Sequence, residues 1–266
     1  MIFKKYENKI LKNNPLKNVI CQLKFPNILS INEELPAKFQ EEIRDEFPNF
    51  QEITEMQNEI VINTNLENNF LRPSFTQQKP IKNFKFSTRD GGTSINLTSS
   101  FIALSTLNYS TWEDFCSKLK KIIYLFQDIY RPAYFTRIGL RYIDTFNYFR
   151  YSITNETLSE YFNNSVLGLL SDKTISSAVY SMQNSVELHS QEDVVVKILA
   201  TIAQVIGEEG NSFVLDSDFI FSGQSDINGF EDILNRLHLE ASGFLHWAVS
   251  KKMEELMEYG EVNGAL

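Results

Sequence analysis

Two segments of the chain alternate apolar and polar residues with the period of two that is typical of strands. In the first segment the apolar positions are Val19, Cys21, Leu23 and Phe25. In the second they are Ile138, Leu140 and Tyr142. Because successive side chains of a strand point to opposite faces, each segment should bury one face and leave the other to polar residues.

Helical periodicity follows each of these strands. An apolar residue at every fourth position predicts a helix over about Ile31–Phe47, and a corresponding helix is expected over about Glu156–Leu170. Longer helices are predicted from about Thr111 to Tyr130 and from about Gly229 to Tyr259. The second of these is longer than the first and would project, cross between the two halves of the chain or pack in a dimer.

Both long helices begin with the spacing of a capping box. Ser110 stands three residues before Glu113, and Asn228 stands three residues before Glu231. An acid in the first turn of a helix satisfies backbone N–H groups, so both glutamates are expected to cap helices rather than to act in catalysis.

The remaining strands are expected as antiparallel sets between the helices. In the first half they cover about Glu52–Asn63, Asn83–Thr88, Ser94–Thr98 and Phe101–Thr106. In the second half they cover about Ala178–Leu188, Val194–Gln204, Ser212–Asp216 and Asp218–Ser222. Glycine-containing turns at 89–92 and 207–210 mark hairpins.

The order strand, helix, strands, long helix therefore occurs twice. Residues 95–102 align without gaps with residues 213–220, an offset of 213 − 95 = 118, and the same offset brings 112–115 onto 230–233. We divide the chain into a lead-in of residues 1–14, a first repeat unit of residues 15–133 and a second of residues 134–266 with an extended final helix. Whether the two units share one sheet is left open.

These elements predict an α+β fold with a mostly antiparallel sheet and long helices packed on one face. The doubled order resembles the fold of the TATA-box-binding protein and the related helix-grip domains. In those proteins one sheet curls over helices and its other face stays open. The resemblance is topological and implies no function.

The composition favours a globular protein and disfavours nucleic-acid-binding and membrane proteins. The chain has 42% hydrophobic residues and 21 Phe, which predicts aromatic-rich cores. A net charge of −9 disfavours binding to nucleic acid, which requires basic residues. The first residues lack the apolar core of a signal peptide, and no apolar run is long enough to span a membrane, so we expect a cytoplasmic protein without membrane contact.

The cysteines, the histidines and the known catalytic motifs indicate no catalytic or metal site in this sequence. Cys21 and Cys116 lie among apolar residues and are expected to be buried, reduced thiols. His189, His238 and His246 lack the spacing and the additional ligands of a metal site. No phosphate loop, dinucleotide-binding motif, metalloprotease motif or serine-hydrolase motif occurs, so we expect no enzyme activity, no cofactor and no metal.

The segment 137–144, RIGLRYID, resembles the central RxGLRY motif of an uncharacterised, sporadically distributed bacterial protein family. Pro15-Leu16 before the first strand fits the same family, and so does Tyr109 followed by Trp112 before the first long helix. The resemblance spans nearly the whole chain and implies a prokaryotic cytoplasmic protein. Asn is the usual residue of the family where Asp144 stands, and no catalytic residue is carried over.

Arg137 and Arg141 are the main candidates for a binding site. They lie on the polar face of the second alternating strand, where Gly139 between them would let a ligand approach. Gln22 and Lys24 lie on the corresponding face of the first strand. Two arginines on one face could grip a carboxylate or a phosphate. Alternatively they pair with acids and only position strands. The acids in question are Asp144, Asp216 and Asp218.

Three functions follow from these observations. The leading hypothesis is a non-enzymatic binding or adaptor protein that acts through a protein partner or as a homo-oligomer, in keeping with a mobile or defence-type locus for the resembled family. The second is a helix-grip domain that binds a small anionic ligand between sheet and helix, with Arg137 and Arg141 at the rim. The third is binding of nucleic acid by the open sheet face, which the net charge makes the least favoured.

Overall fold

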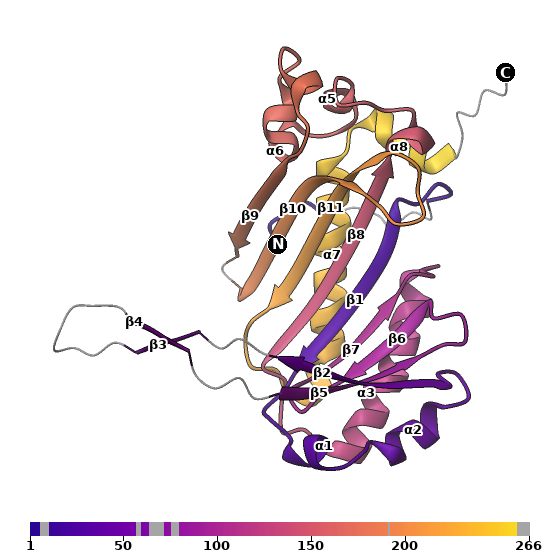
Figure 1. Ribbon diagram of the computed structural model, residues 1–266, viewed down its shortest axis with the longest axis vertical. Helices are drawn as coiled ribbons and strands as arrows, with labels where there is room; N and C mark the ends of the chain where they lie inside the picture. Colours follow the sequence, from indigo (N-terminus) through magenta and orange to yellow (C-terminus); the bar gives the residue numbers. More distant parts are fainter. Residues whose placement is uncertain (6–10, 57–59, 64–71, 76–79, 191, 260–266) are drawn as a thin grey trace.

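A computed structural model describes the chain except for residues 6–10, 57–59, 64–71, 76–79, 191 and 260–266. Its central element is a nine-stranded sheet in the order β2-β5-β6-β7-β1-β8-β11-β10-β9 (Figure 1), with all neighbouring strands antiparallel. The strands are β1 (Leu16–Lys24), β2 (Asn49–Met56), β5 (Pro80–Ser87), β6 (Thr93–Leu97), β7 (Phe101–Thr106), β8 (Arg137–Asn147), β9 (Gln183–His189), β10 (Val194–Gln204) and β11 (Asn211–Phe221). A separate two-stranded ribbon consists of β3 (Ile60–Asn63) and β4 (Arg72–Phe75).

The helices are short except for two. They are α1 (Leu29–Glu33), α2 (Ala37–Ile43), α3 (Trp112–Tyr130), α4 (Tyr148–Tyr151), α5 (Leu158–Tyr161), α6 (Asn164–Leu167), α7 (Phe230–Ala248) and α8 (Lys251–Tyr259). Three 3-10 turns add η1 (Gly168–Ser171), η2 (Ser176–Ala178) and η3 (Ile227–Gly229). The fold is therefore α+β, with α3 and α7 packed against one face of an open antiparallel sheet (Figure 1).

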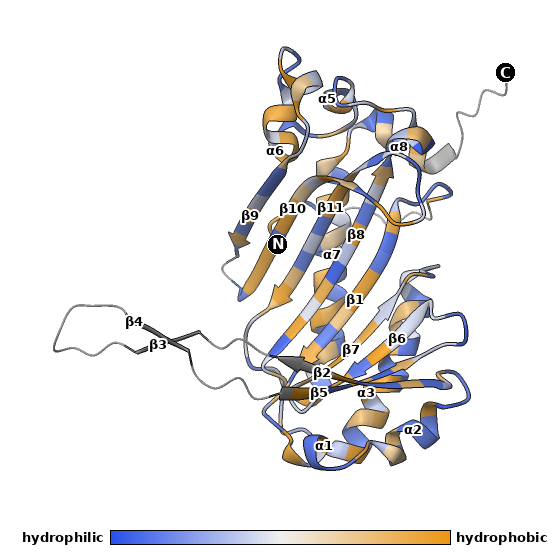
Figure 2. Cartoon of the chain, in the orientation of Figure 1, coloured by the Kyte–Doolittle hydropathy of each residue, from blue (hydrophilic) through white to orange (hydrophobic). Residues whose placement is uncertain are grey.

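Strands β1 and β8 lie side by side at the centre of the sheet, with Cys21 opposite Leu140. Both halves of the chain thus contribute to one sheet. The faces predicted from the alternation are confirmed. The side chains that face the helices have no exposed surface at Val19, Cys21, Leu23, Ile138 and Leu140. The residues between them are mostly polar, and Figure 2 shows this mixture of hydropathies along both strands.

The long helices α3 and α7 have 19 residues each, and their first residues are separated by 230 − 112 = 118 positions, the offset found in the sequence. They pack against each other through polar contacts near the start of α7. Glu231 accepts a hydrogen bond from the Tyr124 hydroxyl, and the Lys120 ammonium lies 2.5 Å from the same carboxylate.

Neither helix begins with the capping box that the sequence predicts. Thr111 has extended backbone, and its hydroxyl accepts a hydrogen bond from the Asp114 N–H, so the cap lies one residue later than expected. At α7 the turn η3 precedes the helix and no side chain caps it. Glu231 instead reaches across to α3, and this tertiary contact replaces the local cap.

Three predicted helices are shorter or divided. Pro36 separates α1 from α2, because proline lacks the N–H that a continuous helix needs. The helix expected over 156–170 consists of α5, α6 and η1, with the Asn163 side chain capping α6. The final helix breaks at Val249, whose extended backbone pairs with Phe162. Hence α7 alone is no longer than α3, and the residues predicted to extend it form the separate helix α8.

The hairpin expected at residues 212–222 is a single strand. β11 runs without a turn from Asn211 to Phe221 and pairs with β8 on one side and β10 on the other. In the first half the aligned residues do form a hairpin, β6 and β7. The difference has a physical cause, because β11 pairs along its length with both β8 and β10, and arginines of β8 engage Asp216 and Asp218 in place of a turn.

Other strands agree closely with their expected ranges. β7 and β10 have the bounds that the sequence predicts, whereas β9 begins at Gln183 and not near Ala178. None of the helices in the described part of the chain has the length and hydropathy that a bilayer-spanning segment requires.

Candidate functional site

The four residues predicted as a binding site all lie on the face of the sheet opposite α3 and α7. Gln22 stands opposite Gly139, and Lys24 opposite Arg137. Nη1 of Arg137 donates a hydrogen bond to Oε1 of Gln22 at 2.8 Å, so the structure brings residues of both central strands together.

Both arginines are paired with aspartates of β11. Nη2 of Arg137 lies 3.0 Å from Oδ2 of Asp218. Arg141 donates two hydrogen bonds to Asp216, one of them from Nε at 2.7 Å. An anionic ligand would have to displace these carboxylates. The geometry therefore favours the alternative in which the arginines position neighbouring strands.

Gly139 serves the arginine rather than a ligand. A Cβ atom at this position would lie 2.8 Å from Nη1 of Arg137. The missing side chain lets the guanidinium group lie across the strand toward Gln22 and Asp218.

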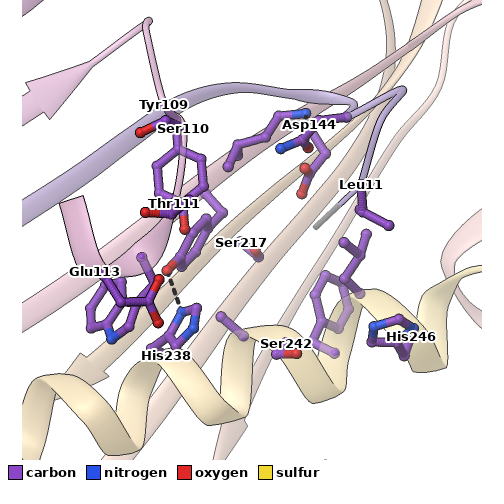
Figure 3. A pocket seen from close by; sticks show the side chains of 17 residues that line it. Leu11, Tyr109, Ser110, Thr111, Glu113, Asp144, Ser217, His238, Ser242 and His246 are labelled. Atoms are coloured by element: carbon purple, nitrogen blue, oxygen red, sulfur yellow. Dashed lines mark hydrogen bonds between the residues drawn. The ribbon is translucent and has the colours of Figure 1, made fainter. Parts of the chain in front are cut away.

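A cavity of about 360 Å³ lies on the other side of the sheet, between β8, the start of α3 and the second half of α7 (Figure 3). Seventeen of the described residues line it. They are Leu11, Asn14, Leu16, Tyr109, Ser110, Thr111, Trp112, Glu113, Tyr142, Asp144, Ser217, His238, Ala241, Ser242, Phe244, Leu245 and His246. The cavity draws on both halves of the chain and on the segment that precedes β1.

Asp144 is the most unusual group in this cavity. It is only 4% exposed, and among the described residues none forms a hydrogen bond or an ion pair with its carboxylate. Burial raises the pKa of Asp144 to about 7, and the charge of Asp216 on the opposite face of the sheet acts in the same direction. The side chain therefore changes its ionisation near neutral pH.

Another wall of the cavity consists of aromatic side chains from β8, α3 and α7. The Tyr142 hydroxyl and Nδ1 of His238 are 2.8 Å apart, and the imidazole stacks on Trp112 with ring centres 4.1 Å apart and planes inclined by 3°. Burial lowers the pKa of His238 to about 4, although Glu113 acts in the opposite direction. The imidazole is thus neutral at physiological pH and fixed on both sides.

The cavity combines acids with aromatic walls. Its described lining contains the carboxyl groups of Asp144 and Glu113, the aromatic rings of Tyr109 and Trp112, and no lysine or arginine. Such a lining can hold a compact ligand that donates hydrogen bonds or carries a positive charge.

The sequence interpretation missed this site. It assigned Glu113 to a helix cap and noted Asp144 as a departure from a family pattern and as a possible partner of the arginines, which pair with Asp218 and Asp216 instead. One signal was present, because Asp144 continues the inward-facing series of Ile138, Leu140 and Tyr142. An acid on the buried face of a strand destabilises the fold unless a cation or hydrogen-bond donor pairs with it. Such a residue is therefore a candidate for a functional site.

The predictions for cysteine agree with the structure. Cys21 and Cys116 are both buried and free. Burial raises the pKa of both thiols, which makes them poor nucleophiles. Within the described ranges of the chain, no group of three or more His, Cys, Asp or Glu side chains is arranged to hold a metal ion.

A second hollow, of about 570 Å³, lies under the edge strand β9. Apolar side chains of β9 and β10 form one wall, and residues 2–4 and the end of α7 form the other. Val186 of β9 remains 39% exposed in this hollow.

Comparison with known proteins does not identify a family. No family model matches the chain. No curated protein matches it either. One solved structure, described as "KH domains", aligns over 94% of this chain and 88% of its own length at 10% sequence identity, with a TM-score of 0.23. This likeness is too weak to carry a conclusion about fold or function.

Proposed function

We propose that the protein is a non-catalytic binding protein that holds a small organic ligand in the cavity between the sheet and its two long helices. The observation that carries the proposal is the buried carboxyl group of Asp144, which no described residue neutralises and which lies in a cavity of suitable size. Binding is preferred over catalysis because the neighbouring His238 is a weak base, with a pKa lowered to about 4.

The arrangement of the two halves of the chain supports this proposal. The strand order is symmetric about the β1–β8 pair, with β7 and β6 on one side and β11 and β10 on the other. The helices α3 and α7 follow β7 and β11 at equivalent points of the chain. We propose that the two halves are copies of one unit, joined as in the TATA-box-binding-protein-like and helix-grip folds. The cavity then lies where the two copies meet. The RIGLRYID segment on β8 fits the bacterial family that it resembles.

Native mass spectrometry of gently purified protein tests the cavity. We expect an additional small mass on the wild-type chain. Ala241→Leu should remove it, because the larger side chain fills the cavity. Ala200→Leu, the same change in the hollow under β9, is the matched control and should retain it. A bare protomer mass, or an adduct that survives Ala241→Leu, contradicts the proposal.

A protein partner is the second candidate function. In the described part of the chain β9 is an edge strand that pairs only with β10, and its apolar Val186 is 39% exposed beside the second hollow. An extended segment of a partner could add to this edge through backbone hydrogen bonds. We expect Val186→Lys to release a co-purifying protein that Val186→Ile retains. Equal retention by both variants excludes this edge as the contact surface.

Two alternatives lose support from the same geometry. An anionic ligand on Arg137 and Arg141 would compete with Asp218 and Asp216, which already neutralise both charges. Nucleic-acid binding by the open face would depend on the same arginines in a chain of net charge −9.

A further inference from the structure

We infer that the ligand of this cavity is a small organic cation, a compact amine in its ammonium form, and that its charge lies against the carboxylate of Asp144. The inference rests on the proposed function and names the class of ligand. It follows from the charges of the cavity, from the placement of its aromatic rings and from its size.

The charge balance of the lining favours a cation. Asp144 and Glu113 are acids, and the lining residues that the structure describes include no lysine or arginine. His238 is neutral at physiological pH, and Nδ1 of His246 lies 2.7 Å from a Glu254 carboxylate oxygen. An anion in the cavity would be repelled by Asp144 and Glu113, whereas an ammonium group would supply a partner that Asp144 does not find among the described residues.

Burial makes Asp144 the anchoring group. Its exposed fraction of 4% means that solvent cannot stabilise the charge, and no described residue does so. Figure 3 shows the Asp144 carboxyl group at the cavity, between the side of Tyr109 and Ser110 and the side of Leu11. A cation in the cavity would reach it directly. Burying an ionised carboxylate without a partner destabilises the ligand-free protein. A cationic ligand that pairs with the carboxylate relieves this destabilisation, and the free energy recovered contributes to binding.

The aromatic residues suit the same class of ligand. The rings of Tyr109 and Tyr142 line the cavity beside Asp144, and they provide both apolar walls and the negative ring faces that attract cations. A volume of about 360 Å³ admits a compact amine and excludes a large cofactor. The arginines on the opposite face of the sheet do not line the cavity and cannot neutralise Asp144 from there.

Three small probes of similar shape distinguish the effect of ligand charge on affinity from the effect of ligand shape. Benzylamine is cationic, benzyl alcohol neutral and benzoate anionic. Binding of each to the full chain is measured at pH 8 by ligand-observed NMR and by calorimetry. We expect benzylamine to bind at least about tenfold more tightly than either analogue, because it alone pairs with the ionised carboxylate. Asp144→Asn should remove this preference, and continued binding of benzyl alcohol by the variant would report that its cavity is intact.

The pH dependence of wild-type affinity gives a second test that needs no variant. Between pH 8 and pH 5.5 benzylamine affinity should fall by about 30-fold, because protonation of Asp144 removes its charge. The other described titratable groups near Asp144 come from each element packed around it: Tyr109 and Glu113 at the start of α3, His238 and His246 of α7, Tyr142 of β8 and Tyr151 of α4. Asp216 of β11 acts on it from the opposite face of the sheet. Benzyl alcohol affinity should stay constant over this range.

The possible outcomes distinguish the inference from the proposed function. If benzyl alcohol or benzoate binds as tightly as benzylamine, the cavity is a binding site and the inference about charge is wrong. If the Asp144→Asn variant keeps the preference for benzylamine, another group carries it, and the assignment of Asp144 is wrong. If none of the probes binds at millimolar concentration, both the inference and the proposed use of the cavity are overturned.

Discussion

Replacing Asp144 with asparagine is expected to change how the stability of the protein depends on pH. Burial raises the pKa of this carboxyl group from its ordinary value of 3.8 to about 7 in the folded chain. Between these two values the unfolded chain has released the proton and the folded chain has not. Stability therefore falls as pH rises through this range, and the loss is complete above pH 7.

The size of the effect follows from the two pKa values. The interval from 3.8 to about 7, at about 1.36 kcal/mol for each pH unit, corresponds to a destabilisation of about 4 kcal/mol at pH 8. Asparagine carries no charge and escapes this loss. Its amide brings two N–H donors into a site without a described partner, which costs about 1 kcal/mol. The variant should thus be slightly less stable than the wild type near pH 4 and more stable by about 3 kcal/mol at pH 8.

Urea unfolding of both proteins at pH 4 to 8 measures this difference. Only the difference between the two proteins is interpreted, because the other acids of the chain titrate in both. Asp90→Asn provides a control with the opposite sign. The Thr88 hydroxyl and the Gly92 N–H hold the pKa of Asp90 below its ordinary value, so this variant loses stability at neutral pH and recovers toward the wild type in acid. A stability difference for Asp144→Asn that does not change with pH would refute the reasoning.

Three further substitutions test other contacts of the fold. Tyr142→Phe removes the hydroxyl that meets His238 and should cost about 1 kcal/mol in urea unfolding, with a larger loss if the imidazole moves from its stack. Gly243→Ala should expose the start of the chain to limited proteolysis, because the new Cβ would lie 2.6 Å from the carbonyl oxygen of Lys4; unchanged cleavage would show that the contact is not needed. Arg141→Ala should destabilise by less than about 1 kcal/mol, since its ion pair is partly exposed, and a larger loss would mean that it fixes the sheet.

The surfaces of the central strands were predictable from the sequence because burial there follows a local period. The inward positions of β1 and β8 are apolar in alternation, and the structure buries them as expected. The two long helices were also found at their correct spacing, since an apolar stripe at helical period is a property of adjacent residues. Arg137 and Arg141 were correctly assigned to the open face for the same reason.

Local patterns failed where a contact from elsewhere in the chain competed with them. Glu231 has the spacing of a helix cap, but Lys120 and Tyr124 of α3 hold it instead. Residues 212–222 carry the signs of a hairpin, but β8 and β10 offer hydrogen bonds along their whole length and keep β11 straight. Each outcome depended on a neighbour that is distant in sequence.

The sequence by itself determined which residues face inward on the central strands, and among these it placed an acid at Asp144. Only the tertiary structure decided what surrounds that acid. Antiparallel pairing of β1 with β8 brings the two halves of the chain together, and α3 and α7 then set Glu113 and His238 beside the same cavity. No periodic pattern in the sequence predicts that these three side chains line one cavity, because their arrangement depends on how the sheet and helices pack. The shift in the pKa of Asp144 in turn depends on the desolvation that this packing imposes.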